Sequence, residues 1–115
     1  MKKIYHLASC STCKRILDEL KPGKDVALQD IKTEGITEEQ LDEMKTLAGS
    51  YEALFSRVAL KYRAMGLHEK QLTENDYKNL ILEEYTFLKR PVILSGEKIF
   101  IGNSKATVAK AKSEF

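Results

Sequence analysis

The most informative segment of the chain lies near its N-terminus, where residues 2–15 read KKIYHLASCSTCKR. Residues 2–8 alternate loosely between apolar and polar side chains, a pattern that predicts a buried strand. The residues that follow, about 11–21, repeat apolar side chains at helical spacing and predict a helix. The two cysteines, Cys10 and Cys13, therefore lie at the turn from a strand into a helix.

The remainder of the chain adds a second strand, a helical insert, a hairpin and a last helix. Residues 26–31 predict the second strand, and two apolar runs, 91–94 and 98–101, flank a turn that contains Gly96, as in a hairpin. The order is therefore βαβ, a helical insert over about residues 37–88, and ββα. It predicts an α/β fold with a mixed sheet of about four strands.

The insert carries two signals for the start of a helix. Residues 37–40 (TEEQ) form a capping box, and Thr73 opens a further helix with Leu88 among its inward-facing positions. Between these signals, residues 50–65 include apolar side chains such as Val58 and predict one or two short helices.

Length and composition limit the class of protein. A chain of 115 residues, 43% hydrophobic and 31% charged, suits one domain over residues 1–115 with an ordinary core. A net charge of +2 is too small to indicate nucleic acid or an acidic membrane as the main partner. No apolar run approaches the ~20 residues that span a bilayer, and the N-terminus is too polar for a signal peptide. We therefore expect a cytoplasmic protein with no membrane partner.

Two cysteines at this spacing indicate chemistry rather than a structural role. A secreted disulfide scaffold of this size carries more cysteines, at wider spacing. The thiolate is the reactive form, and a helix N-terminus favours it because the unpaired N–H groups attract an anion. Lys14 and Arg15 add positive charge one turn further on. The sequence thus favours an exposed, attacking Cys10 and a less accessible, resolving Cys13, with a reversible disulfide between them feasible.

Two other interpretations of the cysteines stay open: the pair is inert, or it holds a metal ion. A zinc site needs four ligands. Besides Cys10 and Cys13, only His6 and His68 are available, and their spacing matches no closed zinc motif. We therefore predict no metal site.

A second feature is the Arg90-Pro91 pair, which opens the third predicted strand. Proline cannot donate to a strand ladder and is confined to positions such as this one. The Arg90 guanidinium either points towards the thiols, where it would stabilise a thiolate or bind an oxyanion, or extends into solvent. The sequence leaves both orientations open.

The cysteine turn, the insert and the Arg-Pro strand occur together with several short motifs. These are CSTCKR (10–15), ALFSR (53–57), YRAMGL (62–67), LKRPVI (88–93) and IG (101–102). Together they resemble the ArsC/Spx family of thioredoxin-fold proteins, which includes arsenate reductases and the transcriptional regulator Spx. The resemblance runs nearly end to end. It implies a thioredoxin-like fold in which Pro91 is cis and packs beside the cysteine pair.

The resemblance to the arsenate reductases implies a thiol-dependent oxidoreductase with a small oxyanion or thiol substrate. Cys10 would be the nucleophile, Cys13 the resolving thiol, and Arg90 a ligand of the thiolate or oxyanion. No bound cofactor is implied, and a redox partner protein would supply electrons from glutathione and glutaredoxin or from thioredoxin. The further substrate-binding residues would be Arg57, Lys14 and Arg15.

The resemblance to Spx implies an alternative, a redox-sensing transcriptional regulator in which the cysteine pair is a disulfide switch. Its partner would be the C-terminal domain of the RNA polymerase α subunit. The sequence contains no helix-turn-helix and no basic stripe, so direct contact with nucleic acid is not expected. Where the reductases place a third arginine after the last strand, this chain has Gly102 and Asn103.

Overall fold

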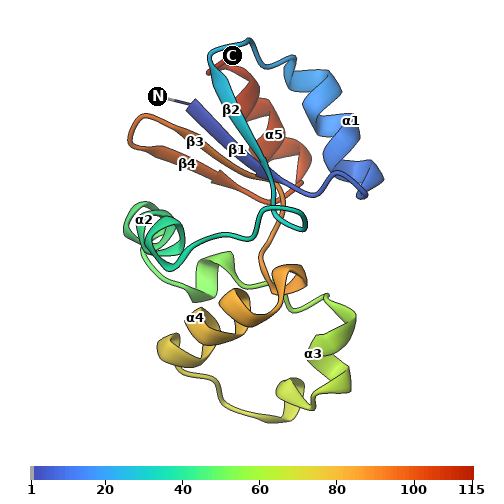
Figure 1. Ribbon diagram of the computed structural model, residues 1–115, viewed down its shortest axis with the longest axis vertical. Coiled ribbons are helices and arrows are strands. Elements are labelled where there is room, and N and C mark those ends of the chain that lie inside the picture. Colours follow the sequence, from blue (N-terminus) through green and yellow to red (C-terminus); the bar gives the residue numbers. More distant parts are fainter. Residues whose placement is uncertain (1) are drawn as a thin grey trace. The chain divides into compact units, whose positions relative to one another are not determined.

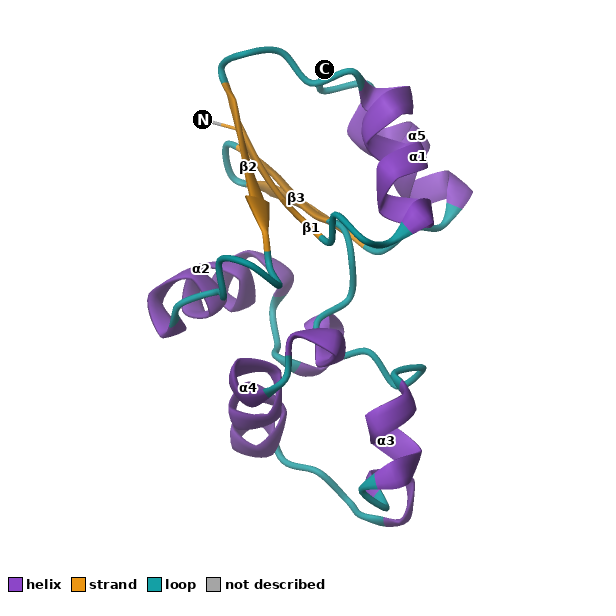
Figure 2. Cartoon of the chain, turned by 45° about the vertical axis from the view of Figure 1, so that its right-hand side comes forward, coloured by secondary structure: helices purple, strands orange, loops and turns teal. Residues whose placement is uncertain are grey.

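The computed structural model describes residues 2–115, which form four strands and five α-helices (Figure 1). In chain order these are β1 (Lys2–His6), α1 (Ser11–Leu20), β2 (Val26–Asp30), α2 (Glu38–Ala48), α3 (Leu60–Ala64), α4 (Glu74–Glu83), β3 (Val92–Ser95), β4 (Lys98–Ile101) and α5 (Lys105–Lys112). Three 3₁₀ turns, η1 (Glu52–Leu54), η2 (Leu67–Glu69) and η3 (Tyr85–Phe87), lie between α2 and β3. The order confirms the predicted α/β fold, with helices separating βαβ from ββα (Figure 2). Within residues 2–115, no helix is long and apolar enough to cross a membrane.

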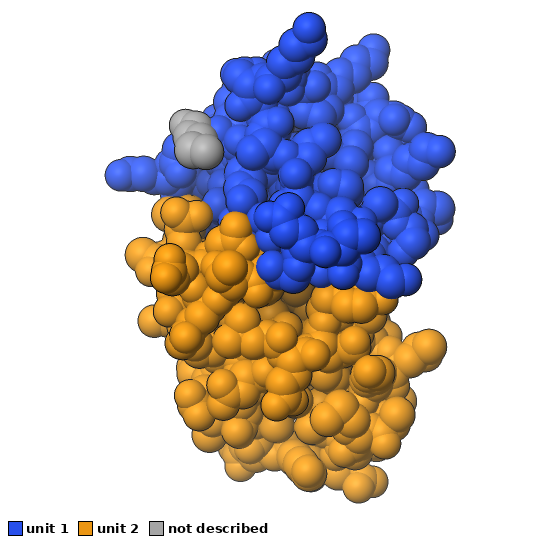
Figure 3. All heavy atoms as spheres, viewed as in Figure 1, with its two compact units in different colours: residues 1–35, 90–115 blue, residues 36–89 orange. Residues whose placement is uncertain are grey.

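The chain divides into two compact units (Figure 3). Unit 1 combines Met1–Gly35 with Arg90–Phe115 and contains the sheet, α1 and α5. Unit 2 is Ile36–Lys89 and contains α2, α3 and α4. The prediction of one domain over residues 1–115 is not tested by this division and stays a prediction.

The sheet of unit 1 has the strand order β2-β1-β3-β4. β1 pairs in parallel with β2, so that Ile4 lies opposite Leu28, and pairs antiparallel with β3. β3 and β4 form the predicted hairpin, whose turn includes Gly96 at a φ of 61°, a value that residues with a Cβ rarely adopt. The mixed four-stranded sheet is therefore confirmed, and the strand that leads to Cys10 is a central one.

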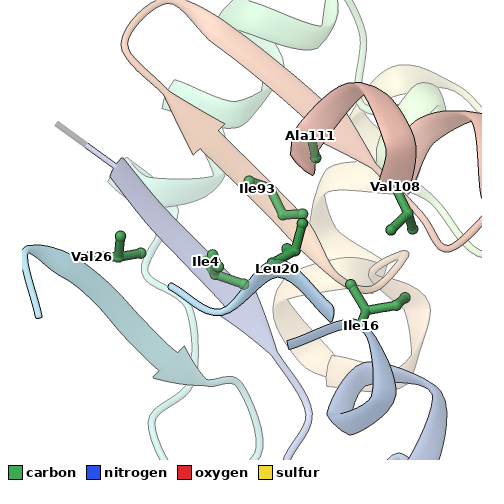
Figure 4. Close-up of a cluster of buried hydrophobic side chains, with 7 residues drawn as sticks. All are labelled: Ile4, Ile16, Leu20, Val26, Ile93, Val108 and Ala111. Atoms are coloured by element: carbon green, nitrogen blue, oxygen red, sulfur yellow. The ribbon is translucent and has the colours of Figure 1, made fainter. Parts of the chain in front are cut away.

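Helices α1 and α5 cover one face of this sheet (Figures 1 and 2). Ile16 and Leu20 lie four residues apart, so they share the face of α1 that meets the sheet. Burial of each such side chain contributes about 1.5–3 kcal/mol. This core therefore fixes α1, and with it the cysteine turn, on the sheet. The buried cluster consists of Ile4, Ile16, Leu20, Val26, Ile93, Val108 and Ala111 (Figure 4).

Unit 2 is built from capped helices and clustered aromatic rings. Thr37 and Gln40 form the predicted capping box at the start of α2, and Thr73 forms another with Asp76 at the start of α4. These bonds satisfy N–H groups that the first turn of a helix leaves unpaired. The ring of Phe55 contacts those of Tyr62, Tyr77 and Phe87.

One detail of unit 2 differs from the sequence prediction, and another agrees with it. Leu88 is buried, but α4 ends at Glu83, and Leu88 instead forms a β-bridge with Phe55. The one or two short helices predicted for residues 50–65 are present as η1 and α3, and Val58, between them, is 91% exposed.

Candidate active site at the cysteine turn

Cys10 is the N-cap residue of α1, just after the turn that follows β1. Its backbone is extended (φ −92°, ψ 116°). Its N–H donates to the carbonyl of Leu7 at 3.0 Å, and its own carbonyl accepts from the N–H of Lys14 at 3.1 Å. These bonds fix the thiol at the N-terminus of a ten-residue helix, where unpaired amides favour negative charge.

The Cys10 thiol is free and partly exposed, and its pKa lies below the usual value of 9.0. Burial by itself raises this pKa. The backbone N–H and the thiol of Cys13, the backbone N–H of Thr12 and the charge of Arg90 together outweigh burial. The side chain of Cys10 makes no capping hydrogen bond in the structure. The surroundings of Cys10 thus favour its reactive form.

Cys13 lies one helical turn further along, inside α1, and is only 1% exposed. Burial, together with the neighbouring Cys10 sulfur, raises the pKa of the Cys13 thiol to about 11, although the backbone of Leu7 and the charge of Arg90 act in the opposite direction. Cys13 therefore remains protonated at neutral pH. Its S–H group stabilises the Cys10 thiolate by a hydrogen bond.

Arg90 lies two residues before β3 and is joined to Pro91 by a cis peptide bond, which agrees with the family resemblance. Pro91 is buried, and its carbonyl accepts the N–H of Gly102 at 3.0 Å. The charge of Arg90 lowers the pKa of both thiols. The orientation of the guanidinium towards the cysteines stays a prediction. Cys10, Cys13 and Arg90 thus form one electrostatic group.

Comparison with known proteins assigns this arrangement to a family. The ArsC family model matches residues 5–111. The chain belongs to the ArsC family. The resemblance noted in the sequence is therefore confirmed.

Solved structures and curated relatives of the ArsC chain agree with this assignment. The YffB (PA3664) protein is 25% identical, covers 96% of this chain and 98% of its own, and has a TM-score of 0.79. A possible arsenate reductase from Streptococcus mutans UA159 is 27% identical, with coverage of 91% and 92% and a TM-score of 0.68. The global transcriptional regulator Spx 2 of Bacillus anthracis is 24% identical over 113 residues, which are 96% of this chain and 86% of the relative. The relatives thus carry the names of both an enzyme and a regulator.

Three further basic residues were expected to bind substrate in this ArsC chain. Lys14 and Arg15 are exposed on α1, and the charge that contributes most to the low pKa of Cys10 is that of Arg90. Arg57 belongs to unit 2, where its Nη2 lies 2.7 Å from Glu52 Oε2 and donates to Tyr77 Oη at 2.9 Å. The substrate-binding roles of all three stay predictions.

Each of the two histidines in this ArsC chain lies beside an acidic residue. His6 ends β1 opposite Asp30 of β2. His68 lies in η2, with its Nε2 3.9 Å from Glu69 Oε1. Across residues 2–115, no three His, Cys, Asp or Glu side chains gather as they would around a metal ion.

Asp30, the last residue of β2, was not predicted to belong to this site. Its Oδ1 accepts the N–H of Ala8, in the turn between β1 and Cys10, at 3.3 Å. The carboxyl ends of adjacent parallel strands lie at the same edge of a sheet, and ligands bind there in open α/β folds. This rule, applied to the predicted strands 2–8 and 26–31, would have found Asp30.

Proposed function

We propose that this ArsC-family protein is a thiol-dependent oxidoreductase that reduces a small oxyanion of the arsenate type. The observation that carries the proposal is the opposite displacement of two thiol pKa values within one helical turn. The pKa of Cys10 is lowered, that of Cys13 is raised to about 11, and Arg90 lies near enough to act on both. The relative described as a possible arsenate reductase supports the substrate class.

In the first step, the Cys10 thiolate attacks the central atom of the oxyanion. A bond forms between Sγ and that atom, and one oxygen takes up protons and leaves as water. Negative charge then moves from the sulfur to the remaining oxygens. The amides of Thr12 and Cys13 and the Arg90 guanidinium, which favour the thiolate, are suited to hold these oxygens.

In the second step, a second thiolate attacks Sγ of Cys10. A disulfide bond forms, the bond between Sγ and the central atom breaks, and its electron pair stays on the central atom, which is reduced by two electrons. Cys13 is the candidate within the chain. Once the Cys10 sulfur is bound in the adduct, it is no longer a thiolate that accepts the S–H of Cys13, so the hydrogen bond that helps to raise the pKa of Cys13 is lost.

The oxidised protein then needs two electrons from outside the chain. Glutathione with glutaredoxin, or thioredoxin, would reduce the disulfide between Cys10 and Cys13. Glutathione would alternatively attack the Cys10 adduct in place of Cys13. Neither route uses a bound cofactor, and both use a redox partner in a reducing compartment such as the cytoplasm.

A coupled arsenate-reduction assay tests the proposal, with glutathione plus glutaredoxin in one series and thioredoxin in the other. Cys10→Ser serves as the blank, and Cys13→Ser is the matched control on the same helix. We expect turnover that is lost in Cys10→Ser. Retention of turnover with glutathione in Cys13→Ser would assign the second attack to the external thiol. Failure of the wild type to turn over arsenate with either donor would overturn the proposal.

A second candidate function is a redox-sensing regulator of transcription. The Bacillus anthracis relative named Spx 2 and the presence of Gly102 and Asn103 in place of a third arginine favour it. The same thiol pair would then switch between dithiol and disulfide, and the partner would be the RNA polymerase α subunit. Pull-down of purified α subunit by the reduced and oxidised protein tests this candidate. Equal or absent capture in both states would exclude a redox-gated interaction.

A further inference from the structure

Asp30 connects the ends of β1 and β2 with the turn that carries Cys10. Its Oδ1 accepts two backbone N–H groups, from Ala8 at 3.3 Å and from Lys32 at 3.2 Å. Its Oδ2 accepts the hydroxyl of Thr33 at 3.2 Å. Of these three hydrogen bonds, only the one from Ala8 joins the end of β2 to the turn that follows β1. Ala8 lies two residues before Cys10.

The turn that leads to Cys10 is short, and two backbone hydrogen bonds flank it. Cys10 N–H donates to Leu7 at 3.0 Å, which closes the turn upon itself, and Ile31 N–H donates to His6 at 2.9 Å, which continues the strand pairing up to the turn. Ala8 lies between these two bonds and is exposed. Its N–H would point into solvent without the carboxylate of Asp30.

We propose that Asp30 is a positioning residue for the thiol chemistry at Cys10. By holding Ala8 at the sheet edge, Asp30 sets the path of the turn, and thereby the position of the Cys10 sulfur against the amides of Thr12 and Cys13. This inference rests on the proposed function of Cys10. It adds a residue that acts through the backbone and touches neither substrate nor the reacting sulfur.

The carboxylate form of Asp30 is maintained at neutral pH. Burial is the largest single effect and opposes ionisation, but the N–H groups of Lys32 and Ala8, the hydroxyl of Thr33 and the neighbouring His6 together hold the pKa of Asp30 below its usual value of 3.8. Hydrogen bonds to an ionised acceptor are stronger than those between neutral groups. The tie to Ala8 is therefore charge-assisted throughout the pH range in which a thiolate reacts.

Two substitutions separate the effect of the hydrogen-bond acceptor at Asp30 from the effect of its negative charge. Asp30→Asn keeps an oxygen that can accept from Ala8 and Lys32, whereas Asp30→Ala removes the acceptor. Loss of the negative charge alone would lower the pKa of Cys10, because a nearby anion disfavours a thiolate. Loss of the tie to Ala8 would raise it. The informative quantity is therefore the difference between Asp30→Ala and Asp30→Asn.

The readout is the pH–rate profile of Cys10 alkylation by iodoacetamide, followed by mass spectrometry of the full-length protein. We expect Cys10 to react roughly fivefold more slowly in Asp30→Ala than in Asp30→Asn at pH 6. The two rates should converge above the pKa of Cys10, where this thiol is ionised in both variants. Asp25→Ala, at an exposed aspartate ahead of β2, is the control and should follow the wild type. Equal profiles for Asp30→Ala and Asp30→Asn would overturn the inference.

A measurement on the wild type covers the case in which Asp30→Ala does not fold. The amide resonance of Ala8 should shift with pH as the carboxylate that it binds is protonated, with a midpoint below 3.8. An Ala8 amide that does not titrate would show that the tie is absent in solution. If the wild-type Cys10 has an ordinary thiol pKa, the proposed function fails; if that pKa is low but indifferent to Asp30, only this inference fails.

Discussion

At pH 7, iodoacetamide should modify Cys10 at least about tenfold faster than Cys13, although both thiols are free and lie one helical turn apart. With a pKa of about 11, Cys13 is ionised to about one part in 10⁴ at pH 7. Cys10, whose pKa lies below 9.0, is ionised to more than about one part in 100. The ratio of the two thiolates therefore exceeds about 100.

The stronger nucleophilicity of a more basic thiolate offsets part of this ratio. With a Brønsted coefficient of about 0.4–0.5, a difference of two pKa units makes the Cys13 thiolate roughly six to ten times more nucleophilic than the Cys10 thiolate. A ratio of at least about ten remains from ionisation alone. The near-complete burial of Cys13 acts in the same direction, because the reagent reaches its sulfur only when α1 opens.

The assay is site-resolved mass spectrometry of quenched time points between pH 5.5 and 10, with Cys10→Ser and Cys13→Ser isolating each thiol. In Cys10→Ser, the pKa of Cys13 should fall from about 11, because a charge and a hydrogen bond that raise it are removed, while burial continues to raise it. Equal rates for the two thiols at pH 7, or a Cys10 midpoint at or above 9, would refute the reasoning.

Three further predictions concern the charge at the site, the core and a helix cap. Arg90→Ala should raise the pKa of Cys10, shifting its alkylation profile to higher pH, with Arg90→Lys closer to the wild type; an unchanged profile would mean that the guanidinium points away. Ile93→Ala, at a side chain with 0% exposure in the middle of the sheet, should lower the free energy of unfolding by about 2–5 kcal/mol in urea denaturation. Thr37→Ala should cost about 1 kcal/mol in the same experiment through loss of the α2 cap, whereas Thr37→Ser should be nearly neutral.

Most of the fold could be predicted because its elements carry strong local signals. The strand before Cys10, the capping boxes at Thr37 and Thr73 and the hairpin around Gly96 each depend on neighbouring residues, and all are present in the structure. Leu88 is buried as expected, but the helix that was expected to carry it ends at Glu83. Periodicity does not reveal where a helix ends.

The reactive residues of the site could be predicted from the sequence, but the burial and the backbone contacts that set their properties could not. Cys10 and Cys13 are apparent from their spacing, and Arg90 from its place before Pro91 at the start of a predicted strand, although the sequence leaves the orientation of its guanidinium open. The elevated pKa of Cys13 depends on burial against the sheet, and the role of Asp30 depends on the register between β1 and β2. Both are tertiary properties, so no single segment of sequence encodes them.

Unit 1 is built from two segments that are far apart in the sequence, and this affects when it can fold during synthesis on the ribosome. β1 and α1 are made early, but their antiparallel neighbour β3 follows only after the whole of Ile36–Lys89. Until Arg90–Phe115 has emerged, Ile93, Val108 and Ala111 are not in place to cover Ile16 and Leu20. We therefore expect nascent chains to expose both cysteines as ordinary, similarly reactive thiols, so that the difference between Cys10 and Cys13 arises only after Arg90–Phe115 has been synthesised.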